Sequence, residues 1–163
     1  MHVRCSSGKL SIPSELLTRP GRLSDTEVAV VRTHSQAGFD MLNKVHFPDH
    51  VAEMVLQHHE RSDGSGYPHG LRGDQIAMGS RIIAVADVLE SMASTRPYRA
   101  ALGIDAALDE MRSGAGTRFD PDVVRACVTL VENGTVRFDD RGSLVPACSR
   151  PGAAFSPPGP ERS

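Results

Sequence analysis

The sequence contains few aromatic residues and few cysteines. None of its 163 residues is tryptophan and aromatic residues make up only 4%, so a core must be built mainly from aliphatic side chains. The three cysteines, Cys5, Cys127 and Cys148, form no C-x-x-C pair, which argues against a disulfide framework and fits a reducing compartment. No apolar run approaches the roughly 20 residues that span a bilayer. We therefore expect a cytoplasmic protein without a membrane segment.

An excess of charge of one sign is also missing. The formal net charge is −2, so no overall basic field attracts duplex nucleic acid or an acidic membrane. A few local arginines can still bind a small anionic ligand. The 39% of hydrophobic and 23% of charged residues are typical of a soluble globular domain. Residues 149–163 carry four prolines among small and polar residues, and we expect this tail to be disordered.

Between these ends the pattern predicts an all-α fold. A capping box formed by Ser24 and Glu27 predicts a helix to about residue 44. Pro48 suits the first turn of a second helix that runs to about residue 58, and Asp120 followed by Pro121 predicts the start of a helix that ends near residue 132. Helices are also expected at residues 80–93 and about 104–112. The first of these should be mostly buried, through Ile82, Ile83, Val85, Ala86 and Leu89. A weaker signal indicates a short hairpin within residues 135–148.

Histidines and one aspartate stand where metal ligands are plausible. His58 and His59 are adjacent at the expected end of a helix, about 100° apart around its axis, so they can face two neighbouring metals. Asp87 lies in an apolar helix, where a carboxylate needs a metal or an ion pair; Arg81, Arg96 and Arg99 are the candidate partners for an ion pair. With His34 as a further ligand, the set suits iron, manganese, zinc or nickel better than calcium. The plainer alternative is one solvated histidine and one packed histidine.

Two further segments carry groups suited to a ligand. Residues 61–73 form a glycine-dense loop, called the glycine loop below, in which Asp63 precedes two glycines and Tyr67 precedes Pro68. The tyrosine can contact a base or phosphate, or simply be an exposed ring in a turn. Arg96 and Arg99 flank a Pro-Tyr pair, and guanidinium groups bind phosphate and the guanine edge.

Taken in order, these segments resemble the HD-GYP domain. The matching strings are HHERSDGSGYP at residues 58–68, SRIIAVAD at 80–87, RPYR at 96–99 and FDPDVV at 119–124, preceded by His34-x-x-x-Gly38. The resemblance implies an HD-type helical bundle over residues 11–134 that binds a divalent metal, typically iron or manganese, and hydrolyses cyclic di-GMP to pGpG or GMP. It implies His34, His58, His59 and Asp87 as metal ligands, with Tyr67, Arg96, Arg99 and Asp63 near the dinucleotide. Diguanylate-cyclase-type signalling domains are the partners that such a domain implies.

The sequence departs from this family near its start. Gly8 and Lys9 match the segment that follows the signature His-Asp pair, and the resemblance implies Lys9 and Asp87 as catalytic residues. The His-Asp pair itself is replaced by Cys5 and Ser6, so residues 1–10 are a degenerate remnant of that segment. Because Ser6 supplies no anionic bridge between metals, we expect one to two ions at most.

Three functions remain open from the sequence. The first is a metal-dependent cyclic di-GMP phosphodiesterase with impaired activity. The second is a non-catalytic module that binds cyclic di-GMP or a signalling protein. The third is an inert remnant that needs another chain to fold. Since the helices that precede the His-Asp segment are missing, apolar surface should be exposed on the remaining helices and promote self-association.

Overall fold

The structure, a computed structural model, describes residues 23–45, 50–93, 103–138 and 144–146. Within them, five α-helices, a 3-10 turn and one pair of short strands follow one another. These are α2 (Asp25–Asn43), α3 (Val51–Gln57), η2 (Gly73–Gln75), α4 (Met78–Ala93), α5 (Ile104–Gly114), α6 (Pro121–Glu132), β1 (Val136–Phe138) and β2 (Leu144–Pro146). The predicted all-α class is confirmed. Among the described residues, no helix combines the length and the apolar character needed to cross a membrane.

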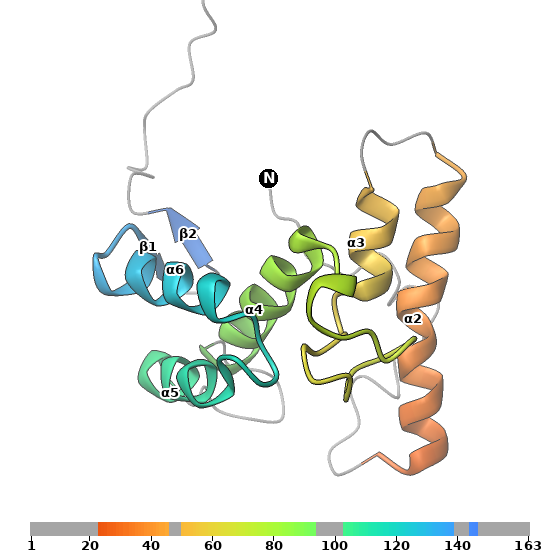
Figure 1. Cartoon of the computed structure of the whole chain (residues 1–163), viewed down its shortest axis with the longest axis horizontal. Helices are drawn as coiled ribbons and strands as arrows, with labels where there is room; N and C mark the ends of the chain where they lie inside the picture. Colours follow the sequence, from red (N-terminus) through yellow and green to blue (C-terminus); the bar gives the residue numbers. More distant parts are fainter. Residues whose placement is uncertain (1–22, 46–49, 94–102, 139–143, 147–163) are drawn as a thin grey trace, which may run out of the picture.

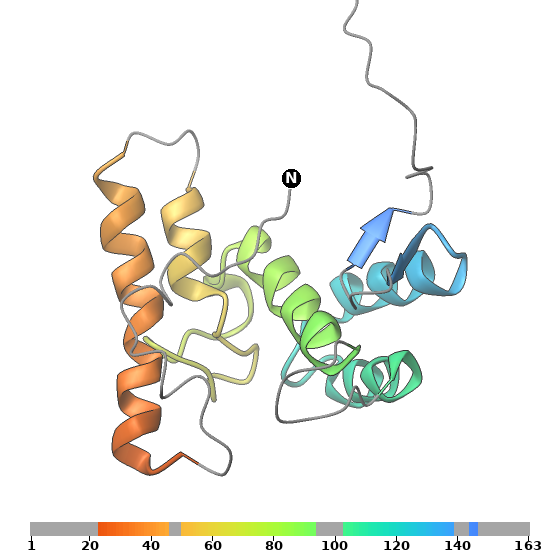
Figure 2. The same cartoon turned by 180° about the vertical axis from the view of Figure 1, so that it is seen from behind.

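Helix α4 lies between two groups of helices. Helices α2 and α3 pack side by side on one side of it, and α5 and α6 pack on the other, with β1 and β2 next to α6 (Figures 1 and 2). The two strands pair antiparallel, with Arg137 opposite Val145. The chain crosses from α3 to α4 through the glycine loop, so this loop lies at the junction of the two groups.

Local signals set two of the helix starts as predicted. The Ser24 hydroxyl accepts the backbone N–H of Glu27 at 3.3 Å, and the Glu27 carboxylate accepts the backbone N–H of Ser24 at 2.8 Å. The Asp120 side chain accepts the backbone N–H groups of Asp122 and Val123 ahead of α6. Each cap satisfies amides that would otherwise lack a partner in the first helical turn. The ends of α5 and α6 also fall at or within two residues of the predicted positions.

The predicted start of the second helix is wrong. Helix α3 begins at Val51, because His50 before it has a φ of 49° in the left-handed region, which a right-handed helix does not admit. Pro48, expected in its first turn, lies outside the described residues.

The main core lies between α4, α5 and α6. Its buried side chains are Val85, Leu89, Ala107, Leu108, Met111, Phe119 and Val124. Burying a large aliphatic side chain contributes about 1.5–3 kcal/mol, so this half of the molecule has the larger share of the apolar stabilisation. Cys127 packs against the cluster, as expected for a core thiol.

The prediction that Ile82 is buried is wrong. Its exposed fraction is 51%, and that of Met78 one turn earlier is 53%. Both lie on the same helical stripe as the buried Val85 and Leu89. Periodicity therefore predicted burial for the whole stripe. Helices α5 and α6 cover only its later part, so Ile82 stays exposed.

Candidate functional site

Three histidines from two helices meet in the α2–α3 half of the molecule. His34 lies in the middle of α2, His58 is the C-cap of α3, and His59 follows it directly. His34 and His58 are each only 2% exposed, and His59 is half-buried. The Nε2 atom of His34 lies 3.4 Å from Nε2 of His58 and 3.0 Å from Nε2 of His59. One candidate ligand atom from each ring lies within 4.8 Å of the other two.

The backbone fixes which nitrogen of two of these rings is available. Nδ1 of His34 lies 2.6 Å from the Val31 carbonyl oxygen, and Nδ1 of His58 lies 2.6 Å from the Val55 carbonyl oxygen. A carbonyl oxygen only accepts, so each Nδ1 must carry the hydrogen that is donated. In the neutral ring, Nε2 then presents its lone pair. The two lone pairs face each other, an arrangement that a shared cation relieves.

The spacing of the nitrogens fits one divalent ion. Imidazole nitrogens bind such ions at about 2.0–2.1 Å, and two adjacent ligands of one ion are then about 2.8–3.0 Å apart in octahedral geometry and about 3.3–3.4 Å apart in tetrahedral geometry. The two separations of the His34 nitrogen from those of His59 and His58, 3.0 Å and 3.4 Å, are close to these values. Backbone carbonyls that hold Nδ1 are also the usual outer partners of metal-binding histidines. The donor set therefore fits a metal centre formed by His34, His58 and His59.

Asp87 lies on α4 and is half-buried, but the structure does not place its carboxylate within the cluster of three imidazoles. Its charge acts instead on Arg61. Burial lowers the pKa of Arg61, and the nearby Asp87 and Tyr67 partly offset that effect. The alternative partner Arg81 is engaged elsewhere, with Asp74 and Asp120. Arg61 is thus a cation close enough for its charge to act on Asp87, while the other predicted partners, Arg96 and Arg99, lie outside the described residues.

Tyr67 covers one face of the histidine cluster. Its ring stacks on the His59 imidazole, with 4.8 Å between centroids and 27° between planes. On α2, the guanidinium carbon of Arg32 lies 4.9 Å from the centre of the same tyrosine ring. Burial raises the pKa of Tyr67 to about 12, against the opposing effect of Arg32 and Arg61. The phenol therefore keeps its proton and can donate it in a hydrogen bond at neutral pH.

The glycine loop that carries Tyr67 is tightly folded. Asp63 accepts the backbone N–H of Ser65 at 2.9 Å and is exposed; its hydrogen bonds from Ser65 hold the pKa of this carboxyl below its usual value. Asp63 also forms a β-bridge with Arg72. The carboxyl of Asp63 thus shapes the turn of the loop.

Three residues near the cluster were not identified from the sequence. They are Arg32 over Tyr67, Arg61 near Asp87, and Glu60, which is 2% exposed and accepts backbone N–H groups of the glycine loop. For Glu60 a signal existed, because it directly follows the paired histidines. For Arg32 the sequence offers no such signal, since an exposed arginine on a helix is usually solvated.

Several predicted site residues lie outside the described residues. These are Lys9, Arg96 and Arg99, together with Cys5 and Ser6 at the place of the His-Asp pair. Of the other histidines, His50 and His69 are exposed, as expected for residues without a role in the cluster.

Comparison with known proteins gives consistent matches. Residues 2–123 match the model of a family described as HD domain. A cyclic di-GMP phosphodiesterase response regulator of Xanthomonas campestris is 39% identical over 148 residues, which are 89% of this chain and 38% of that protein. A cyclic di-GMP phosphodiesterase of Thermotoga maritima is 39% identical over 76% of this chain and 34% of its own length.

Relatives named for another cyclic dinucleotide also match. A 3′3′-cGAMP-specific phosphodiesterase of Vibrio cholerae is 39% identical over 73% of this chain and 26% of its own length. A crystal structure of a cyclic GMP-AMP-specific phosphodiesterase of that organism covers 81% of this chain and 34% of its own, with a TM-score of 0.51 and 22% identity, which supports the fold alone. The chain thus spans between about a quarter and two-fifths of the length of these relatives.

Proposed function

This chain belongs to the HD domain family, and on that premise we propose that it is a metal-dependent phosphodiesterase that hydrolyses cyclic di-GMP. The observation that carries the proposal is the convergence of three imidazole nitrogens within 4.8 Å of one another, with that of His34 at 3.0 Å and 3.4 Å from the other two, as two ligands of one divalent ion would be. Relatives named as cyclic di-GMP phosphodiesterases supply the substrate class.

His34, His58 and His59 would hold the metal, with Asp87 on the neighbouring helix as a fourth ligand after a change of side-chain position. Iron or manganese is proposed from the resemblance to the HD-GYP domain, because the donor set by itself also suits zinc or nickel. When bound, such an ion supplies Lewis acidity at a phosphate oxygen and lowers the pKa of water.

Hydrolysis adds one water across a phosphodiester bond. An oxygen of water forms a bond to phosphorus, the bond from phosphorus to the ribose oxygen breaks, and that oxygen leaves as a hydroxyl. The product is linear pGpG, and a second cleavage gives GMP.

Tyr67 is proposed to contact the dinucleotide from its position stacked on His59, with its phenol as a hydrogen-bond donor. Arg96 and Arg99 are proposed to bind phosphate or guanine, and Lys9 to assist the reaction. Asp63 is proposed to keep the loop in place.

Metal content tests the centre directly. The full chain and a His34→Ala variant would be equilibrated with Mn²⁺, dialysed, and measured for bound metal, with the exposed His69 changed to alanine as the matched control. We expect about one ion per chain in the natural protein and in the control, and a loss of at least about tenfold in affinity for His34→Ala. Equal metal content in all three proteins would contradict the assignment.

Hydrolysis assays then test the substrate. Because relatives are named for cyclic di-GMP and for 3′3′-cGAMP, both would be offered to the metal-loaded chain. We expect faster cleavage of cyclic di-GMP. A preference for 3′3′-cGAMP, with the same dependence on His34, would keep the reaction and overturn the proposed substrate.

A second candidate function is binding of cyclic di-GMP without turnover, or of a signalling domain of the diguanylate-cyclase type. It is favoured by Cys5 and Ser6 at the place of the His-Asp pair. We propose that activity is impaired for this reason. A variant with Cys5→His and Ser6→Asp should then gain metal and hydrolytic rate over the natural chain. If the natural chain binds the dinucleotide but neither protein cleaves it, the binding function stands. If the natural chain is already as active as the variant, the impairment is refuted.

A further inference from the structure

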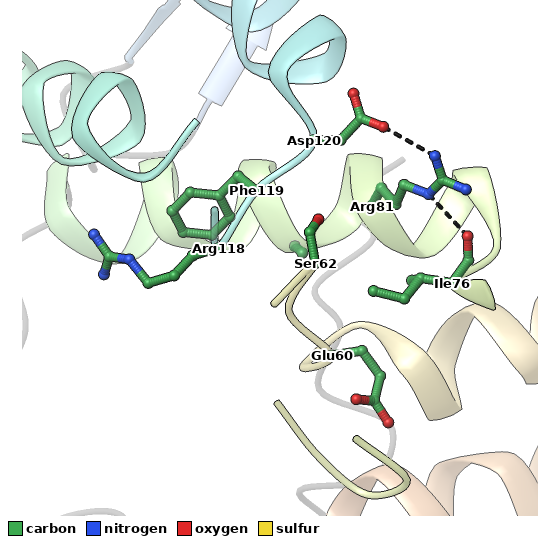
Figure 3. A pocket seen from close by; sticks show the side chains of 8 residues that line it. Glu60, Ser62, Ile76, Arg81, Arg118, Phe119 and Asp120 are labelled. Atoms are coloured by element: carbon green, nitrogen blue, oxygen red, sulfur yellow. Dashed lines mark hydrogen bonds and ion pairs between the residues drawn. The ribbon is translucent and has the colours of Figure 1, made fainter. Parts of the chain in front are cut away.

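Glu60 is a buried acidic residue outside the set of metal donors. Its exposed fraction is 2%, and both carboxyl oxygens accept backbone N–H groups, from His69 at 2.7 Å and from Leu71 at 3.0 Å. Figure 3 shows its carboxyl group pointing away from the Arg81–Asp120 ion pair. A buried carboxyl is stabilised by the groups that bond to it, and both of these hydrogen bonds come from backbone amides of the glycine loop.

The glycine loop closes back on the residues around Glu60. The backbone N–H of Tyr67 donates to the His59 carbonyl at 3.3 Å. Gly66 packs closely against the backbone of Glu60 and Arg61, since a β-carbon on Gly66 would be 2.4 Å from Cα of Glu60 and from the backbone nitrogen of Arg61. The loop is thus held from two sides, by close backbone contact before Pro68 and by the Glu60 carboxyl after it.

The closed loop places an aromatic ring on a candidate metal ligand. Tyr67 stacks on the imidazole of His59, and the Nε2 atom of that imidazole lies 3.0 Å from Nε2 of His34. Of the three imidazoles, His59 is the only one that is not fully buried. The tyrosine ring is therefore one of the contacts that fix the orientation of His59, whereas His34 and His58 are enclosed and bonded to the carbonyls of their own helices.

We propose that Glu60 is a positioning residue, whose carboxyl holds the glycine loop so that Tyr67 stacks on His59 and helps to orient that imidazole toward His34. The link to metal affinity rests on the proposed function. The hold on the loop does not, because it is a property of the metal-free chain. Glu60 acts through the loop and touches neither metal nor substrate.

The test compares Glu60→Gln with Glu132→Gln in the full chain. Glutamine keeps the shape of Glu60, but it offers one oxygen and turns an NH₂ group toward the second amide. Glu132 is an exposed partner of Arg112 on α6 and undergoes the same chemical change away from the loop. Amide exchange is followed by NMR at the backbone N–H groups of His69 and Leu71, and the affinity for Mn²⁺ is measured in the same samples.

We expect Glu60→Gln to speed exchange at both amides by at least about tenfold and to weaken Mn²⁺ binding by about tenfold or more. Exchange at Met111 in the main core should stay unchanged, and Glu132→Gln should alter none of these values. Exchange at His69 and Leu71 at the natural rate would overturn the proposal. Faster exchange with unchanged metal affinity would also overturn it, since Glu60 would then stabilise the loop without positioning the centre.

A second variant keeps the test decisive if Glu60→Gln does not fold. Tyr67→Leu removes the stack and leaves the carboxyl and its two amides in place. This variant should weaken Mn²⁺ binding about as much as Glu60→Gln does, without changing amide exchange at His69 and Leu71. An unchanged affinity for Mn²⁺ would overturn the proposal. If the natural chain binds no metal, the proposed function fails by itself. The near-UV circular dichroism signal of Tyr67 is then measured in a Tyr98→Phe background, where Tyr67 is the remaining tyrosine. Loss of this signal in Glu60→Gln supports the role of Glu60 in holding the loop, and an unchanged signal refutes that role.

Discussion

Asp120 offers a sharp test of the contacts that join α6 to α4. One of its carboxyl oxygens accepts the backbone N–H groups of Asp122 and Val123 at 2.9 and 3.1 Å, and the other accepts from Arg81 at 2.9 Å. The side chains of Asp120 and Arg81 are each 13% exposed. Burial by itself raises the pKa of Asp120, but the hydrogen bonds from Arg81, Val123 and Asp122 outweigh it and hold the pKa below its usual 3.8.

Two substitutions separate the ion pair from the helix cap. Asn is as good an N-cap as Asp, so Asp120→Asn removes mainly the charge that Arg81 binds. A hydrogen bond between charged groups contributes about 1.5–3 kcal/mol, and Arg81 keeps its contacts with Asp74 and the Ile76 carbonyl. We therefore expect a loss of about 1.5–3 kcal/mol in the free energy of unfolding at pH 7. Asp120→Ala also deletes the cap, for roughly 1 kcal/mol more.

The pH dependence gives the sign of the effect. Because the folded-state pKa of Asp120 lies below 3.8, the carboxylate stabilises the fold fully above that value. Its contribution is lost as the pH falls through the lower folded-state pKa. Urea unfolding followed by far-UV circular dichroism at pH 7, 5, 4 and 3 should show the difference between the natural chain and Asp120→Asn shrinking only below about pH 4. Equal stability at pH 7, or a difference that does not change with pH, would refute the reasoning.

Four other substitutions test the packing and one helix cap by urea unfolding. Gly66→Ala should lower the free energy of unfolding by at least about 2 kcal/mol, because its new β-carbon meets backbone atoms at 2.4 Å. Gly79→Ala should change it by less than about 1 kcal/mol, because its β-carbon meets the flexible side chain of Met54 and alanine favours the helix. Equal losses in the two variants would contradict this distinction. Ser24→Ala should cost about 1 kcal/mol through the lost cap, and an unchanged unfolding midpoint would show that this cap contributes nothing. Met111→Ala should cost about 2–5 kcal/mol, since the side chain is fully buried; a loss under 1 kcal/mol would mean that the core closes around the cavity.

The sequence by itself determined where most helices begin and end. The capping box of Ser24 and Glu27 and the Asp120–Pro121 start act within a few residues, so they can be read without knowing the fold. The order of the histidine, glycine and arginine segments also determined the family, which the match over residues 2–123 confirms. His34 and the His58–His59 pair were identified as candidate ligands by this route.

Only the tertiary structure decided which of these groups meet. The convergence of His34 with His58 and His59 depends on how α2 packs against α3, and no local rule sets that contact. Periodicity placed Ile82 in the core, but its burial depends on which part of α4 the other helices cover. The proximity of Arg61 to Asp87 could likewise not be predicted from the sequence. Contacts between residues far apart in the chain arise from packing of whole elements, whereas caps and helix periods arise from neighbouring residues.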